Sequence, residues 1–262
     1  MKKSLSPVSI LFVLSTVVAL LLTACGSGGA GGGSPTEAPT SAPIDSAPMP
    51  VPDMSISKDI LLDPANATDA DSLLIVDYIY EGLVSLEAGA IEPALAESWT
   101  VSDDGLEYTF ILRPNATFHD GSVVNADAVI ANFERWFDKD NATHGSGEFA
   151  AWVALFGGFK GEKDDAGLSK SSFDGIEKVD ELTVLIHLSR LDDKFLAKLV
   201  NPAFSIVSPA ALSAEFFGTS LGKASGTGAF MLASWTETSL SLAPFAGYWN
   251  GIVSDTLEFH FK

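Results

Sequence analysis

The stretch WTVSDDGLEYTFIL, residues 99–112, decides the fold class because it has the pattern of a β-hairpin. Apolar and polar side chains alternate on both sides of the turn Asp103-Asp104-Gly105. Glycine supplies the positive φ that a tight hairpin turn needs, and the alternation gives the sheet one buried face. The sequence therefore predicts antiparallel sheet at 99–112.

Helical and strand patterns alternate around this hairpin. Residues 69–83 place Leu73, Val76, Tyr80 and Leu83 at helical spacing behind the possible caps Thr68 and Asp69, which predicts an amphipathic helix. The other expected elements are a helix at 125–137 capped by Asn125, a long loop at 138–172 with an apolar island at 149–159, a strand at 182–188, a helix at 192–200, a strand at 204–207, a helix at 209–217, and strands at 229–235, 240–243 and 257–261. Such a mixture predicts an α+β body without internal repeats.

Residues 1–24 have the features of a secretory signal peptide. Lys2 and Lys3 precede an apolar run from Val8 to Leu22. The run covers 15 residues, whereas a helix needs about 20 to cross a bilayer. A cleaved signal is therefore the better interpretation than a transmembrane helix.

Cys25 is the one cysteine of the chain and ends the box Leu22-Thr23-Ala24-Cys25. This box resembles the lipobox of bacterial lipoproteins, which implies that Cys25 is lipidated and becomes the first residue of the mature protein. The alternative is a lone cysteine in an ordinary signal. Residues 25–53 then run from Gly and Ser to Pro, Ala and Thr, which predicts a tether that holds the body at 54–262 away from the membrane.

The charge of the chain restricts its partners. The formal net charge is −19, and loss of the two positive charges of Lys2 and Lys3 takes it to −21. Nucleic acid is excluded as a partner because phosphate binding needs clustered Lys and Arg. Anionic lipid is disfavoured as well, which leaves the acyl chains as the membrane anchor. The negative field weakly favours a cationic or zwitterionic ligand, although solubility is the better explanation of the charge.

Motifs for catalysis are weak. The segment Gly218-Thr219-Ser220-Leu221-Gly222 fits the G-x-S-x-G formula of a nucleophile elbow. An elbow needs a buried strand before the serine and a helix after it, whereas here a helical pattern precedes the serine and a Gly-rich loop follows. A secreted serine esterase using Ser220, with Asp255 and His260, stays open as an alternative. We expect no cofactor and no metal site, because metal-ligand spacing is missing around the four histidines His119, His144, His187 and His260.

A series of short motifs runs through the body in a fixed order. They are Leu62–Ala65, Ile79–Val84, Pro93–Trp99, Ser102–Leu106, Phe118–Ser122, Asn125–Val129, Gly226–Phe230 and Tyr248–Gly251. The series resembles family 5 of the extracellular solute-binding proteins, the oligopeptide-, dipeptide- and nickel-binding lipoproteins of ABC importers. The similarity is dense at 62–137 and sparse at 138–225.

The resemblance implies a fold and a function. The family has two α/β lobes that close on a ligand about a hinge, the periplasmic-binding-protein-like or Venus-flytrap fold, and 54–262 corresponds to the first lobe. The implied function is capture of a peptide or related small solute outside the membrane and its delivery to ABC permease subunits, without chemistry. The implied location is the extracytoplasmic face of the cell membrane, or the periplasm.

The resemblance also suggests ligand-binding residues. It places Tyr80 and Glu81 at the edge of the ligand cleft, where the Glu81 carboxylate could pair with a positive group of the ligand. Trp152 and Phe156, about one helical turn apart, are candidates for an apolar cleft wall. Packing in the core is the alternative for Tyr80, Trp152 and Phe156.

Two departures from the family set a further expectation. Members of the family are longer, and 257–262 is an alternating strand pattern with no turn after it. Residues 243–247, APFAG, stand where the family carries a charged stretch. We therefore expect the second lobe to be absent and the body to be truncated, to bind peptide no better than millimolar and to self-associate. A structural surface lipoprotein that has lost ligand binding is the third alternative.

Overall fold

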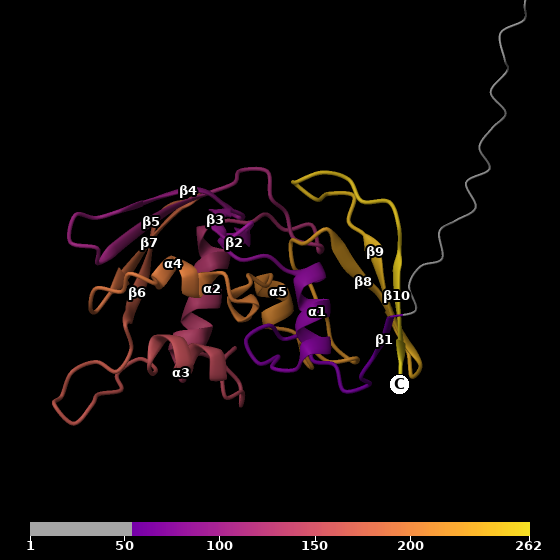
Figure 1. Ribbon diagram of the computed structural model, residues 1–262, viewed down its shortest axis with the longest axis horizontal. Helices are drawn as coiled ribbons and strands as arrows, with labels where there is room; N and C mark the ends of the chain where they lie inside the picture. Colours follow the sequence, from indigo (N-terminus) through magenta and orange to yellow (C-terminus); the bar gives the residue numbers. More distant parts are fainter. Residues whose placement is uncertain (1–53) are drawn as a thin grey trace, which may run out of the picture. The chain divides into compact units, whose positions relative to one another are not determined.

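The computed structural model describes residues 54–262, which form a mixed α/β body with helices packed between two four-stranded sheets (Figure 1). The signal peptide, Cys25 and the tether lie outside the described residues. Among the helices of 54–262, none combines the length and the apolar character that crossing a membrane requires.

The first sheet contains the predicted hairpin, which is confirmed. Strands β4 (Ala96–Val101) and β5 (Glu107–Leu112) pair antiparallel, and Gly105 takes a φ of 72° in the turn between them. β7 (Thr183–Leu188) and β6 (Phe173–Asp180) complete the order β4-β5-β7-β6. The inward residues of β5 and β7 are fully buried, so one face of this sheet forms a wall of the core.

Two helices cover that wall. Helix α2 (Ala126–Phe137) begins as predicted at Asn125, whose side-chain oxygen accepts from the Ala128 N–H at 3.0 Å. Helix α3 (Ala150–Phe156) forms from the apolar island inside the expected loop. The space between the helices and the sheet is filled by buried aromatic rings, among them Phe133, Trp136, Trp152, Phe156, Phe173 and Phe204.

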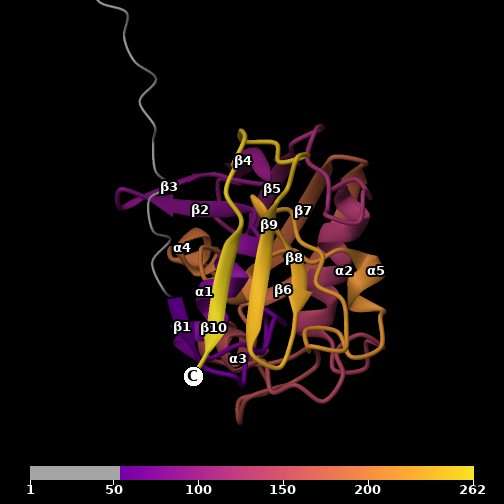
Figure 2. The same ribbon diagram turned by 90° about the vertical axis from the view of Figure 1, so that its right-hand side faces the viewer.

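The second sheet has the order β1-β10-β9-β8. Its strands are β1 (Met54–Ile56), β10 (Leu257–Phe261), β9 (Ser239–Pro244) and β8 (Phe230–Trp235). β1 runs parallel to β10, so the first described residues pair with the last ones (Figure 2). Helix α1 (Ala70–Ile79) packs on this sheet, with Tyr78 edge-on to Phe230 at a centroid distance of 5.5 Å.

Smaller elements connect these layers. They are the hairpin of β2 (Val84–Glu87) and β3 (Ala90–Pro93), helix α4 (Phe195–Leu199), a 3₁₀ turn at Pro202–Phe204 and helix α5 (Pro209–Leu212). Helices α1, α4 and α5 are shorter than predicted. The strand predicted at 204–207 is wrong, because the Val207 N–H and C=O bond the Asn132 side chain of α2 rather than a neighbouring strand.

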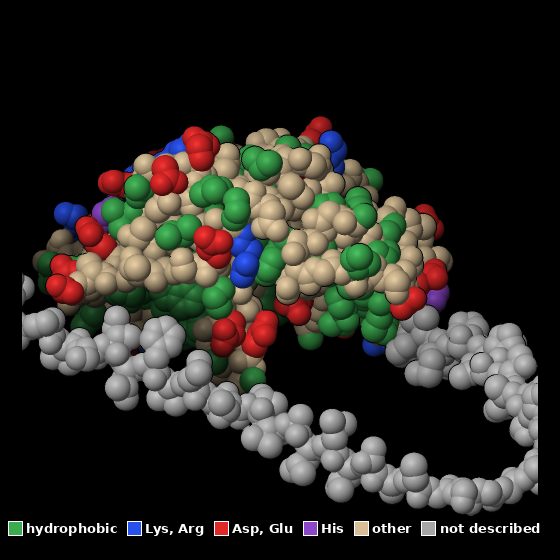
Figure 3. Space-filling view, turned by 90° about the horizontal axis from the view of Figure 1, so that it is seen from above, with side chains coloured by type: hydrophobic (Ala, Val, Ile, Leu, Met, Phe, Trp, Pro, Cys, Tyr) green, Lys and Arg blue, Asp and Glu red, His purple; other side chains and the backbone are tan. Residues whose placement is uncertain are grey.

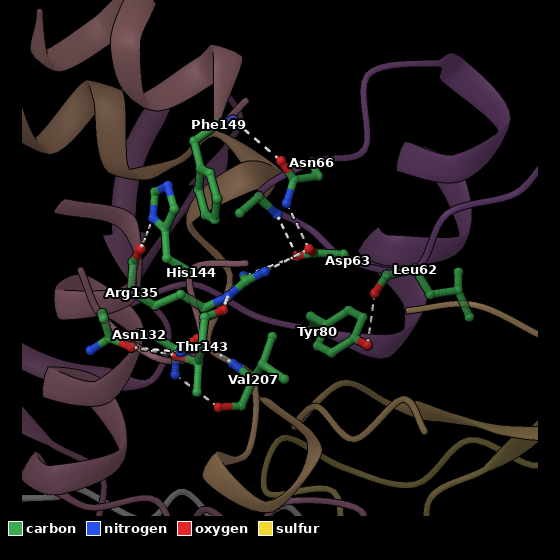
Figure 4. A network of polar contacts seen from close by, with 12 residues as sticks. Leu62, Asp63, Asn66, Tyr80, Asn132, Arg135, Thr143, His144, Phe149 and Val207 are labelled. Atoms are coloured by element: carbon green, nitrogen blue, oxygen red, sulfur yellow. Dashed lines mark hydrogen bonds and ion pairs between the residues drawn. The ribbon is translucent and has the colours of Figure 1, made fainter. Parts of the chain in front are cut away.

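A buried polar network ties the α1 region to α2 (Figure 4). The Arg135 guanidinium donates to both carboxylate oxygens of Asp63, at 3.0 and 2.6 Å, and both side chains are almost fully buried. Asn66 donates to Asp63 at 2.7 Å, and Arg135 also donates to the Thr143 carbonyl at 2.8 Å. The two charges therefore neutralise one another inside the protein.

Candidate functional site

Glu81 is placed by the way the chain leaves helix α1. The helix ends at Ile79, and Tyr80 takes an extended backbone conformation while its N–H still donates to the Val76 carbonyl. The Glu81 carbonyl then accepts from the Ile206 N–H at 2.8 Å, which fixes the backbone of this segment against the residues that follow the 3₁₀ turn. The Glu81 side chain is only partly exposed.

Three neutral donors converge on the Glu81 carboxylate. One oxygen accepts from the Thr227 hydroxyl at 2.8 Å and from the Trp249 indole N–H at 3.0 Å. The other accepts from the Tyr248 hydroxyl at 3.1 Å. A carboxylate has about four acceptor positions, so one position on the second oxygen is left for a further donor.

Glycine brings the first of these donors within reach. Thr227 is fully buried between Gly226 and Gly228. A Cβ atom on Gly226 would lie 2.1 Å from the Ile79 carbonyl oxygen, and one on Gly228 would lie 2.4 Å from that of Tyr78. Only glycine allows this loop to lie against the end of α1, where Thr227 meets Glu81.

The Trp249 side chain is itself in contact with a cation, Arg113. The Arg113 guanidinium lies 4.0 Å from the ring centroid of Trp249, and its Nε donates to the Ala94 carbonyl at 2.5 Å. A cation over the face of a tryptophan ring is attracted by the ring quadrupole. Arg113 therefore orients the indole whose N–H reaches Glu81.

Burial decides the electrostatics of the site. Desolvation raises the pKa of Glu81 above its ordinary value, although the bonds from Trp249, Thr227 and Tyr248 and the charge of Arg113 lower it. Desolvation, together with the neighbouring Glu81 carboxylate, raises the pKa of Tyr248 to about 12. Tyr248 is therefore a neutral hydroxyl donor at physiological pH.

Glu81 faces a cavity of about 480 Å³. The β2–β3 hairpin forms one wall, and residues 199–205 and the segment 248–250 form others. Three carboxylates line the cavity, those of Asp77, Glu81 and Glu87, and its lining contains no Lys or Arg. Acidic side chains are also scattered over the face seen in Figure 3. A cationic group in this cavity would find negative charge and aromatic surface together.

Tyr80 lines the same cavity, but its side chain is committed elsewhere. It is 2% exposed, and its hydroxyl donates to the Leu62 carbonyl at 3.0 Å. Desolvation raises its pKa, so the hydroxyl stays protonated. Core packing, the alternative considered for Tyr80, describes this geometry.

Comparison with known proteins identifies the family. A family model described as bacterial extracellular solute-binding proteins, family 5 (middle), matches residues 90–261. The chain belongs to this family. Among curated proteins, the glutathione-binding protein GsiB of Shigella boydii serotype 4 is 36% identical over 191 residues, and that of Salmonella typhi is 35% identical over the same length.

The family 5 assignment extends to the three-dimensional structure. The periplasmic binding protein DppA from Helicobacter pylori, solved with the peptide STSA, matches with a TM-score of 0.65 and 28% identity, over 80% of this chain and 41% of that chain. HbpA2 from Haemophilus parasuis matches with a TM-score of 0.68 and 28% identity, over 80% and 42%. The curated relatives are covered less fully, because the alignment takes in 72% of this chain and 33% of GsiB. The chain thus spans about a third of the length of the curated relatives it matches.

The prediction that Trp152 and Phe156 form a wall of the ligand cleft is wrong. Both are 1% exposed and lie in the aromatic core between α2, α3 and the first sheet. The Trp152 indole N–H donates to the Gly158 carbonyl at 2.9 Å, inside the protein. Their apolar character reflects burial in this core rather than a cleft wall.

The esterase alternative finds no support in the geometry around Ser220. This serine is exposed in a series of turns after the short helix α5, with no strand before it and no helix after it. A nucleophile elbow requires both elements. The relatives found are substrate-binding proteins by name, not enzymes.

The sequence did not identify the three donors to Glu81 as one site. Thr227, Tyr248 and Trp249 lie 146 to 168 residues away from Glu81 in the chain. Their only signal was membership of the short motifs that carried the family resemblance. Membership of a motif did not reveal that the three side chains meet at one carboxylate.

Proposed function

We propose that this chain belongs to the solute-binding component of an ABC importer and captures a peptide through its positively charged amino terminus. The Glu81 carboxylate, held by three donors with one acceptor position free, is the observation that supports it. The acidic lining of the cavity adds to the preference for a cation. A solved relative that carries a bound peptide, at 28% identity, supports the choice of ligand class.

The proposed complex needs no chemistry from the protein. The amino terminus of the peptide occupies the free position on Glu81, and the β2–β3 hairpin and residues 199–205 contact the residues that follow. The bound peptide is then delivered to permease subunits outside the membrane.

A charge-blocked peptide tests this proposal. We expect calorimetric titration of the full chain to detect binding of trialanine in the millimolar range, and the N-acetylated peptide to give no heat of binding, because acetylation removes the positive charge. Equal affinity for the two peptides would contradict the role of Glu81. A lack of binding by either peptide would contradict peptide capture by this chain.

Replacing Glu81 with glutamine tests the carboxylate itself. Gln keeps an oxygen for Thr227 and Trp249, and its amide can donate to the Tyr248 oxygen, so the fold is retained. The affinity for trialanine should fall by about 1 to 3 kcal/mol, a factor of about 5 to 150. The matched control is Glu92→Gln on strand β3, outside the cavity lining, which should leave the affinity unchanged.

We also propose that the protein is anchored by lipid on Cys25 after removal of residues 1–24, on the extracytoplasmic side. Cys25→Ser should abolish membrane attachment and leave the body folded, because Cys25 is the one thiol of the chain. The measurement is the distribution between membrane and soluble fractions after a high-salt wash. A Cys25→Ser protein that stays in the membrane fraction would overturn the assignment.

A further inference from the structure

The loop Ser225-Gly226-Thr227-Gly228 joins the candidate site to a histidine on a distant turn. We propose that neutral His119 is a positioning residue for the Glu81 carboxylate, and that a proton on His119 releases this loop and disorganises the ligand site. The inference rests on the proposed function only where it calls Glu81 a ligand group. The mechanical link from His119 to Glu81 stands on contacts of the folded chain alone.

His119 holds the loop with its backbone and with both ring nitrogens. Its N–H donates to the Gly226 carbonyl at 2.9 Å, and its Nε2 lies 3.0 Å from the Gly228 carbonyl oxygen. The Gly226 N–H donates to Nδ1 at 3.3 Å. One residue beyond, the Asp120 N–H donates to the Ser225 hydroxyl at 3.1 Å.

The other side of the loop is attached to the segment that carries Glu81. The Gly228 N–H donates to the Ile79 carbonyl at 2.9 Å, and the Thr227 hydroxyl donates to Glu81 at 2.8 Å. The loop therefore lies between the His119 turn and the end of α1. The loop's direct bond to the Glu81 carboxylate is the one from the Thr227 hydroxyl, so a change in the contacts of the loop with His119 reaches that carboxylate through Thr227.

These contacts fix the tautomer of His119. Nδ1 accepts from Gly226 and therefore carries no hydrogen, whereas Nε2 faces a carbonyl oxygen and carries it. A proton added to Nδ1 would set two N–H groups against one another. The charged ring and the Gly226 amide would then separate, and the loop would lose the bond that sits next to Thr227.

The surroundings of His119 favour its neutral form. Burial lowers the pKa of His119, although its bond to the Gly228 carbonyl and the charge of Asp120 raise it. The Phe245 ring lies edge-on to the imidazole at 4.8 Å. Lys223 is the other charged residue that lines the same surface cavity as His119 and Asp120.

The direction of the pH effect follows from this lowered pKa. An exposed histidine titrates near about 6.5, so below that pH the unfolded chain binds more protons than the folded one. The contribution of His119 to stability is therefore complete above about pH 6.5 and is lost as the pH falls toward its lower folded pKa. The ligand site of the folded chain should loosen around this lower pKa, where folded His119 takes up its proton.

Nuclear magnetic resonance on the labelled, ligand-free full chain tests the link. We expect the His119 ring to show the Nε2–H tautomer at pH 8. The Glu81 carboxyl carbon should show two inflections between pH 8 and 4, its own and a second at the midpoint of His119. A Glu81 curve with one inflection, or the Nδ1–H tautomer for His119, would overturn the proposal.

Variants separate a mechanical link from simple charge interaction. Thr227→Val removes the hydroxyl with little change in volume, so the second inflection of Glu81 should disappear while His119 still titrates. Survival of that inflection would show that charge alone couples the two groups, and would overturn the proposal. His119→Gln keeps a donor for Gly228 without titrating and should also remove the inflection.

A control and a fallback complete the test. His187→Gln, on strand β7 and away from the loop, should leave both inflections in place. If His119→Gln does not fold, the titration of Glu81 in Thr227→Val is sufficient to test the link between His119 and Glu81. Because these measurements use no ligand, a failure of trialanine to bind would contradict the proposed function and leave this inference standing.

Discussion

Replacing Asp63 with asparagine is expected to lower the free energy of unfolding by about 3 to 5 kcal/mol. The substitution removes the negative partner of Arg135 and leaves its cation on a side chain that is 4% exposed. The remaining bond to the Thr143 carbonyl does not neutralise the charge. Urea denaturation followed by circular dichroism measures the change.

An exposed ion pair provides the matched control. Lys160 and Asp138 lie 2.6 Å apart, but the lysine side chain is 61% exposed. Asp138→Asn should therefore lower the free energy of unfolding by at most about 1 kcal/mol. Equal losses for Asp63→Asn and Asp138→Asn would show that the Arg135 cation is reached by water in the folded chain.

Local sequence patterns were sufficient to predict the elements that are stabilised by residues close to one another in the chain. The hairpin at 99–112 carries its turn glycine and its alternation within 14 residues, and α2 carries its own cap at Asn125. Both were predicted with nearly correct boundaries. The same holds for β7 and β10, whose alternation is regular.

Sequence patterns gave wrong predictions where tertiary contacts determine the backbone conformation. The apolar run 204–207 has the composition of a strand, but it is buried as an irregular segment because the Asn132 amide satisfies the backbone of Val207. Strand β6 was missed because its outer positions are charged and glycine interrupts it. Its partner β7 lies next to it in the sheet and supplies the hydrogen bonds that its composition does not predict.

The candidate site could be predicted only in part for a related reason. Glu81 was singled out because the resemblance to family 5 places its motif at the edge of the ligand cleft, and it was separated from Tyr80 because a carboxylate is difficult to bury without partners. Its partners come from a glycine loop and from the segment after β9, and only the folded chain brings them together. The sequence shows these groups as separate motifs and contains no measure of their distance.

Trp152→Ala is expected to be about as destabilising as the change at Asp63, with a loss of about 3 to 5 kcal/mol in the free energy of unfolding. The indole packs against Phe156 and Phe173 at centroid distances of 4.5 and 5.3 Å, so its removal leaves a cavity among rings that cannot collapse onto one another. The Gly158 carbonyl would also lose its donor.

The neighbouring position on the same helix makes the result specific. Val153 is 40% exposed, so Val153→Ala should change the free energy of unfolding by no more than about 0.5 kcal/mol. The pair also separates the two interpretations of Trp152. A core residue predicts a large loss of stability from Trp152→Ala, with trialanine affinity retained under conditions where the variant is folded. A cleft wall predicts lost affinity with unchanged unfolding, and that outcome would reverse the correction made from the burial of Trp152.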